Sequence, residues 1–210
     1  MDLLIFWDSG APGGLELPVK RIISGMLDIP SRVCANPLVM NGYVGSRRQT
    51  DACVLLDTID IFKQRQGVRN HVLLVTGNDI FSPGISSLFG LARPSAGAAV
   101  VSTARLSNEF YGRAGSEEDL IDRTVKESAH EIGHLFGLDH CNVPECVMHN
   151  PLTLEDLDRK KRWFCSDCKD IVPIQSATIS LPAPNKSSPP VLVGFFFEGQ
   201  FLGHCGRSTS

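Results

Sequence analysis

The sequence lacks an apolar run long enough to cross a membrane, and it lacks a basic leader. Its apolar stretches fall well short of the roughly 20 residues that a membrane helix needs. An acidic residue, Asp2, stands where a secretory signal would carry positive charge. We therefore expect a cytoplasmic protein that makes no membrane contact.

An excess of positive charge is missing as well. The 210 residues include 20 Lys and Arg against 23 Asp and Glu, so the formal net charge is −3. Because proteins that bind nucleic acid through its phosphates are usually basic, we expect no nucleic-acid partner. There is no internal repeat. The length fits one large domain or two small ones, and we expect a monomer.

The composition is that of a globular protein with alternating strand and helix patterns. Hydrophobic residues make up 42% and charged residues 20%, which excludes wholesale disorder. The alternation predicts an α/β sheet. The predicted strands are Asp2–Trp7, Arg32–Cys34, His71–Thr76, Ile85–Leu91 and Ala98–Thr103. The predicted helices begin near Pro18, at Thr50 (ending at Gln66) and at Ser116 (ending at Phe136), with a loop over 36–46.

The chain changes character after Cys168. Four prolines interrupt residues 181–190, and the apolar stretch 191–202 has no clear period. We predict that residues 176–210 form a tail or a loosely packed extension.

The third predicted helix contains the sequence His130-Glu131-Ile-Gly-His134. At about 3.6 residues per turn, both histidines project from one face and can reach one ion. Glu131 can reach a metal-bound water without binding the metal. The apolar stripe that includes Val125 and Ile132 lies roughly opposite the histidines, so we expect one face on the sheet and the other in a cleft. The alternative is an ordinary amphipathic helix with two surface histidines.

Gly137 and His140 favour the metal site. Gly137 can adopt the left-handed conformation that ends a helix and reverses the chain, which would bring His140 back toward the first two histidines. Three neutral imidazoles with one open position are typical of a catalytic zinc site. Glu155 is a rival third ligand, although Thr153-Leu-Glu-Asp also has the pattern of a helix start.

Four of the seven cysteines lie close together, at Cys141, Cys146, Cys165 and Cys168. In a secreted protein they could form two disulfides. In a chain without an export signal, a metal site is the better interpretation.

At these residues the sequence resembles a known family. The spacing His130-Glu-x-x-His134-x-x-Gly137-x-x-His140 is similar to the extended motif of the metzincin zinc peptidases. Met148 stands where metzincins carry a methionine turn beneath the metal. The order His140-Cys141-x4-Cys146-x-Met148, followed by Cys165-x-x-Cys168, resembles the archaemetzincin family in particular, and the resemblance covers about residues 1–172.

This resemblance implies a fold, an activity and two metal ions. The implied fold class is α/β (α+β), a twisted mixed sheet with an active-site helix in 1–137 and a small zinc-stabilised subdomain in 138–175. The implied activity is zinc-dependent hydrolysis of peptides or proteins by a metal-activated water, with Glu131 as general base. The implied catalytic zinc is held by His130, His134 and His140. The implied structural zinc is held by Cys141, Cys146, Cys165 and Cys168.

Several further residues have two interpretations. Metzincins bind peptides as an added strand, so Gly97–Leu106 is either an edge strand whose Ala98–Ser102 backbone contacts substrate or a plain core strand. His149 either contacts substrate or is a loop histidine. We interpret His71 and His204 as structural and Cys34 and Cys53 as small core residues, and Cys205 has no near partner.

Two other classes of function stay open. One is a zinc-binding interaction module with weak or no catalysis, against which the negative net charge and the intact Glu131 argue. The other is a zinc hydrolase that acts on small amides.

Overall fold

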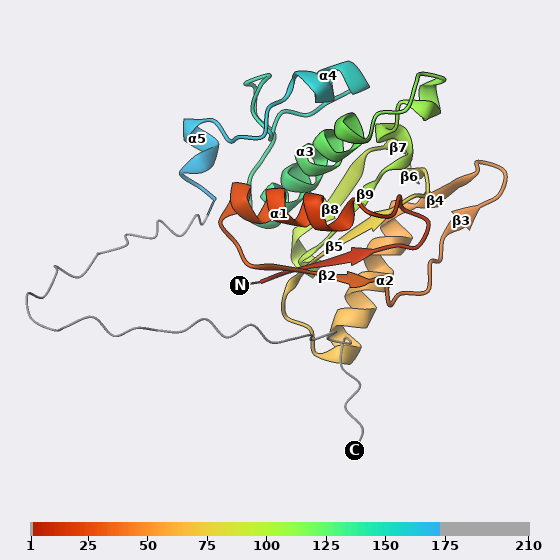
Figure 1. Ribbon diagram of the computed structural model, residues 1–210. Coiled ribbons are helices and arrows are strands. Elements are labelled where there is room, and N and C mark those ends of the chain that lie inside the picture. Colours follow the sequence, from red (N-terminus) through yellow and green to blue (C-terminus); the bar gives the residue numbers. More distant parts are fainter. Residues whose placement is uncertain (1, 173–210) are drawn as a thin grey trace, which may run out of the picture. The chain divides into compact units, whose positions relative to one another are not determined.

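The structure is a computed structural model that describes residues 2–172, which belong to one compact unit, Met1–Gln175. Its centre is a five-stranded sheet with the order β2-β1-β5-β9-β8 (Figure 1). The first four strands of this order run parallel, and β8 runs antiparallel to β9. Their bounds are β1 Leu3–Trp7, β2 Ser31–Ala35, β5 His71–Thr76, β8 Gly90–Arg93 and β9 Ala98–Ser102.

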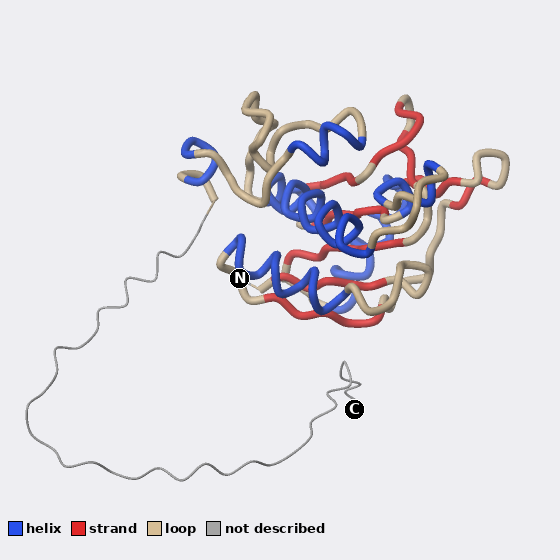
Figure 2. The backbone as a smooth tube through the Cα atoms, turned by 45° about the horizontal axis from the view of Figure 1, so that its top comes forward, coloured by secondary structure: helices blue, strands red, loops and turns tan. Residues whose placement is uncertain are grey.

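Helices cover both faces of this sheet (Figures 1 and 2). Side chains alternate along each strand, so Leu3 and Ile5 pack under α1 and α3 while Phe6 packs on α2. The sheet is therefore a buried middle layer, as parallel sheets usually are. The helix bounds are α1 Glu16–Leu27, α2 Ala52–Gln66, α3 Glu117–Leu135, α4 Leu154–Arg159 and α5 Ser166–Lys169.

Shorter elements complete the frame. A four-stranded sheet has the order β3-β4-β6-β7, with bounds Tyr43–Val44, Gln49–Asp51, Ile80–Ser82 and Ile85–Leu88. Three 3₁₀ turns lie at η1 Pro94–Ala96, η2 Ala104–Leu106 and η3 Glu109–Tyr111. Among residues 2–172, no helix combines the length and the apolar character required to cross a bilayer.

The predicted mixed α/β fold is confirmed, with local differences. The predicted strand Ile85–Leu91 is two strands in two different sheets, because the chain bends at Phe89. The predicted loop 36–46 contains the short strand β3. The boundary at 137/138 stays a prediction. The extension 176–210, with His204 and Cys205, lies outside the described residues.

The edge-strand interpretation of Gly97–Leu106 is wrong. β9 (Ala98–Ser102) lies between β5 and β8, and all five of its residues are buried. The sheet order places β8 at the edge, because the chain turns back through η1 and inserts β9 next to β5. A peptide that adds to this sheet on the active-site side must therefore pair with β8.

Helix α3 is more deeply buried than its amphipathic pattern predicts. It packs on β8 and β9, on α1 and on α4. Its polar residues Lys126, Glu127 and Ser128 are buried along with its apolar ones. The predicted histidine face does look into a cleft, which both histidines and both glutamates of this face line, but α4 and the segment after it bury more of that face than the pattern predicts.

One arginine ties α3 to its neighbours. Arg123, which is 4% exposed, donates two hydrogen bonds to the Asp158 carboxylate at 2.6 and 2.8 Å. Its third nitrogen donates to the Leu106 carbonyl and to Asn108 Oδ1. A planar guanidinium suits such a junction because it presents several donors in fixed directions. Arg123 thus holds α4 and the η2–η3 segment, two walls of the cleft described below.

Candidate active site

The two histidines of α3 lie in its last two turns. Ser116 caps the start of the helix, where its hydroxyl accepts the Asp119 N–H, and three acidic residues in the first turn favour the helix dipole. One turn separates His130 from His134, and their Nε2 atoms are 3.1 Å apart.

His140 lies close to the two histidines of α3, as the position of Gly137 predicts. Gly137 has φ = 88°, a left-handed conformation that glycine adopts without steric cost. The Leu138 N–H then donates to the Gly133 carbonyl, which closes the end of the helix. The returning chain places the His140 ring 5.3 Å from the His130 ring and 4.9 Å from the His134 ring, centroid to centroid.

Backbone carbonyls fix the tautomers of the helical pair. His130 Nδ1–H donates to the Val147 carbonyl at 2.9 Å, and His134 Nδ1–H donates to the Leu138 carbonyl at 2.7 Å. Each neutral ring then carries only a lone pair on Nε2. Burial lowers the pKa of His130 well below its usual value, which favours this neutral form.

This arrangement fits a metal cation. Two lone pairs that face each other at 3.1 Å repel unless a cation lies between them. Nitrogens bound to one tetrahedral zinc are about 3.3 Å apart, since Zn–N distances are about 2.0–2.1 Å. One ring nitrogen from each of the three histidines falls within 4.8 Å of the others. The residues therefore fit a three-histidine zinc site.

Glu131 is buried beside the histidines and lines the same cleft, which has a volume of about 880 Å³. It is 4% exposed. A methyl group at Gly90 would come within 2.7 Å of Glu131 Oε1, so the side chain lies directly against the first residue of β8. The absence of a side chain at Gly90 makes room for this carboxylate.

A second carboxylate lies one helical turn from Glu131. Glu127 is 3% exposed and lines the same cleft. Burial, followed by the charge of Glu127, raises the pKa of Glu131 well above its usual value. Burial likewise raises the pKa of Glu127. A carboxylate with a raised pKa is a stronger base, which suits it to accepting a proton.

Met148 packs beneath the helical pair. It is fully buried, and a methyl group at Gly133 would overlap its sulfur and crowd its terminal carbon. The Cys141 N–H donates to the Met148 carbonyl, and Val147 supplies the acceptor for His130. The methionine turn predicted from the resemblance therefore has side-chain and backbone contacts to the histidine site.

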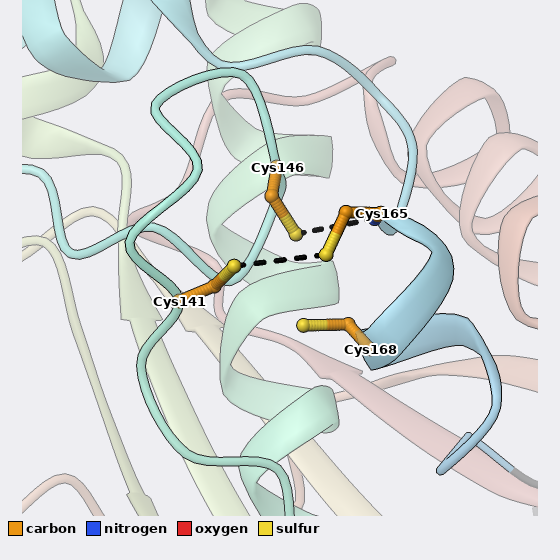
Figure 3. A group of neighbouring side chains, drawn as sticks. All are labelled: Cys141, Cys146, Cys165 and Cys168. Carbon is orange, nitrogen blue, oxygen red and sulfur yellow. Dashed lines mark hydrogen bonds between the residues drawn. The ribbon is translucent and has the colours of Figure 1, made fainter.

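The side chains of the four clustered cysteines point toward one another beside the loop that runs from His140 to Met148 (Figure 3). All four sulfurs lie within 4.8 Å of one another. The sulfurs of Cys141 and Cys165 are 3.7 Å apart, well beyond the roughly 2.05 Å of a disulfide. Four thiolates around one zinc are about 3.8 Å apart, since Zn–S is about 2.3 Å. The cluster thus has the dimensions of a closed tetrahedral site.

Backbone donors already point at some of these sulfurs. The N–H of Cys165 donates to the Cys146 sulfur, and the N–H of Val143 donates to the Cys141 sulfur, both at 3.4 Å. The Cys168 N–H lowers the pKa of Cys165, while burial raises the pKa of Cys168. Such N–H donors stabilise thiolates, the form that binds metal.

The remaining candidates lie away from both clusters or have other partners. Glu155, the rival ligand, is exposed at the start of α4 and pairs with Arg113 at 2.9 Å. His149 Nδ1 lies 3.0 Å from the Cys141 carbonyl, which accepts its hydrogen bond. His71 stacks edge-on against Phe136, in line with a structural role. Cys53 lies half-buried on α2.

Two residues of this site, Glu127 and Lys160, are not predicted by the sequence analysis. Glu127 precedes Glu131 by four residues, a spacing that places both on one helix face, so the sequence did carry a signal for it. Lys160 is 1% exposed, yet it stands in the basic run Arg159–Arg162, whose other members are exposed. A charged run normally indicates a solvated surface, so nothing local marks Lys160 as buried.

Comparisons with known proteins agree with this geometry. Residues 15–173 match Peptidase family M54. An archaemetzincin of Aeropyrum pernix is 36% identical over 172 residues, which cover 76% of this chain and 87% of that protein. An archaemetzincin of Thermococcus kodakarensis is 40% identical over 132 residues, 63% of this chain and 70% of that protein.

Solved structures show the same likeness. A zinc-dependent peptidase from Methanocorpusculum labreanum has a TM-score of 0.77 and 39% identity, and the match covers 81% of this chain and 99% of that one. The archaemetzincin of Methanopyrus kandleri has a TM-score of 0.69 and 31% identity over 82% and 93%. Fold and comparisons together define the class as a zinc metallopeptidase. The chain belongs to peptidase family M54, the archaemetzincins, as the sequence motifs predict.

Gly133 offers a steric test of the contact between the methionine and the helix. We expect Gly133→Ala to displace the Met148 sulfur and to lower the stability of the zinc-loaded protein by about 1–3 kcal/mol, the usual cost of overpacking. Gly25→Ala is the matched control. Its added methyl group meets open space, and the substitution also replaces a glycine in the interior of a helix, α1. Chemical denaturation measures both changes. Equal effects of the two substitutions would contradict the contact.

Proposed function

We propose that this protein hydrolyses peptide bonds at the three-histidine site, with Glu131 as the general base. The observation that carries the proposal is the pair of Nε2 atoms 3.1 Å apart whose Nδ1 atoms are both committed to backbone carbonyls. Three neutral imidazoles leave one tetrahedral position open. A zinc ion held there supplies a Lewis acid that lowers the pKa of water and polarises a carbonyl group.

The chain's own residues perform the proton transfers in this proposal. Glu131 takes a proton from the attacking water and delivers it to the departing amine. Its burial removes competing solvent and raises its pKa, which makes the carboxylate a stronger base. Membership of a peptidase family and the cleft lined by Glu131 support this role.

The free edge of β8 supports an extended peptide as substrate. The Ser102 N–H donates to the Phe89 carbonyl, so Phe89 and Ser102 form a hydrogen-bonded pair of the β8–β9 ladder. Pairs alternate along an antiparallel ladder, so Gly90 and Ala92 direct their backbone groups away from β9. Both residues line the cleft. A substrate strand can therefore bind these groups beside Glu131.

The four cysteines are proposed to hold a second, structural zinc, which gives two ions per chain. Cys141 follows His140 directly, and Cys146 stands two residues before Met148. Ligation at the cysteines would therefore fix both ends of the loop that provides His140 and the Val147 carbonyl. In this way the structural site preorganises the catalytic one.

Metal analysis combined with Glu131→Ala tests the catalytic assignment. We expect two zinc ions per chain in the wild type, one in His134→Ala, and two in Glu131→Ala. We expect Glu131→Ala to lower peptide turnover by roughly 10²–10⁴-fold. Glu118→Ala, at an exposed glutamate in the first turn of α3, is the control and should keep full activity. Unchanged turnover in Glu131→Ala would refute the mechanism, and preference for small amides would redirect the substrate assignment.

The coupling of the two sites predicts a second metal result. Replacing both Cys165 and Cys168 with Ser should lower zinc occupancy at the histidines as well as at the cysteines, because the loop that carries His140 loses its anchor. The double substitution Cys34→Ser and Cys53→Ser, away from the cluster, serves as control. Full occupancy of one site together with wild-type activity in the first variant would contradict the coupling.

A proline tests the substrate edge. We expect Ala92→Pro to raise KM for peptides by up to about tenfold, because it removes one outward N–H, a hydrogen bond of about 1 kcal/mol. Ala92→Val keeps the N–H and controls for side-chain bulk. Steady-state kinetics with peptides that span the cleft measure the difference. The same KM in both variants would show that substrate does not pair with β8 at this position.

A further inference from the structure

Lys160 is a buried charge that the proposed mechanism does not use. It follows α4, where its backbone N–H donates to the Asp156 carbonyl at 3.3 Å. Its side chain is among the largest in residues 2–172 that are fully buried. Burial lowers the pKa of Lys160, since removing an ammonium from water is costly unless negative groups compensate.

One active-site ring nitrogen, His130 Nδ1, lies near Lys160 but does not compensate its charge. Lys160 Nζ lies 3.4 Å from His130 Nδ1. That nitrogen carries a proton, because it donates to the Val147 carbonyl while Nε2 faces the other histidines. Two donors cannot form a hydrogen bond with each other. The ammonium must therefore find its negative partners elsewhere.

Two buried carboxylates, Glu127 and Glu131, stand on either side of His130 in the sequence of α3, and both line the cleft. Glu127 and Glu131 act in the opposite direction to burial and raise the pKa of Lys160. Glu127 Oε2 has no hydrogen-bond partner in the protein, although the residue is 3% exposed. Two like charges in one buried site repel, and each is costly to bury alone. One ammonium buried near two carboxylates offsets part of both costs.

We propose that Lys160 and Glu127 are positioning residues that hold the carboxylate of Glu131 toward the histidine cluster. Glu127 lies one helical turn before Glu131 on α3, and the positive charge of Lys160, in the segment after α4, attracts both carboxylates. The backbone of β8 at Gly90 packs directly against the Glu131 side chain, so Glu131 cannot rotate toward β8. The inference rests on the proposed role of Glu131 as general base.

Lys160→Met tests whether the positive charge of Lys160 is needed, because methionine is apolar and has a similar length. We expect zinc stoichiometry and zinc affinity in chelator competition to stay at the wild-type level. We expect KM to change less than about twofold and kcat to fall about 10–100-fold, the usual effect of a misplaced reacting group. Lys126→Met is the control. This second buried lysine donates to carbonyls at the end of α4 and pairs with Asp122, so its loss should lower stability but not kcat.

Glu127→Gln gives an independent test that keeps the size of the side chain. Alone it should also lower kcat at constant KM. Combined with Lys160→Met it removes one positive and one negative group, so the loss in kcat should be smaller than the product of the two single losses. Multiplicative losses, or parallel losses of kcat, zinc and thermal stability in Lys160→Met, would show a merely structural role and overturn the proposal.

The result is separable from the proposed function. If Glu131→Ala abolishes turnover while Lys160→Met and Glu127→Gln keep wild-type kcat, the positioning inference fails and the mechanism stands. If Glu131→Ala keeps turnover, the general-base assignment itself fails.

Discussion

Two hydrogen bonds from imidazole to backbone determine how this active site is built. The carbonyls of Val147 and Leu138 take the Nδ1 protons of His130 and His134, so both Nε2 lone pairs face the same point. Neither carbonyl belongs to α3. One comes from the turn after the helix and the other from the loop that ends at Met148. The helix therefore supplies the ligands, but the chain beyond it decides which nitrogen each ligand presents.

The loop from His140 to Met148 is held at several points for the same reason. Its ends are joined by the bond from the Cys141 N–H to the Met148 carbonyl, and the Val147 N–H donates to the Trp163 carbonyl. The cysteine cluster joins this loop, through Cys141 and Cys146, to Cys165 and Cys168 at α5. A loop constrained on both sides can keep a carbonyl aimed at His130 within the few tenths of an ångström that ligand geometry requires.

The parts of the structure that the sequence predicts are those whose causes are local. The spacing of His130 and His134, the left-handed Gly137, the Ser116 cap and the paired cysteines each depend on a few neighbouring residues. The sequence left Gly97–Leu106 as either an edge strand or a core strand, because strand order depends on where the chain returns after η1. Burial of Glu127 and Lys160 was missed because the groups that compensate these charges come from another element.

Those compensating groups all involve one short segment. Asp158 accepts hydrogen bonds from Arg123, the carbonyls of Leu157 and Asp158 accept from Lys126, and the charge of Lys160 acts on Glu127 and Glu131. Each contact joins a charged residue of α3 to the end of α4. Without this segment, four charged side chains of the central helix would lose their partners or be exposed to water. Because unpaired burial of even one charge is costly, docking of this segment and formation of the desolvated site around Glu131 are expected to occur together. The buried charged residues of α3 therefore determine where α4 docks on this helix.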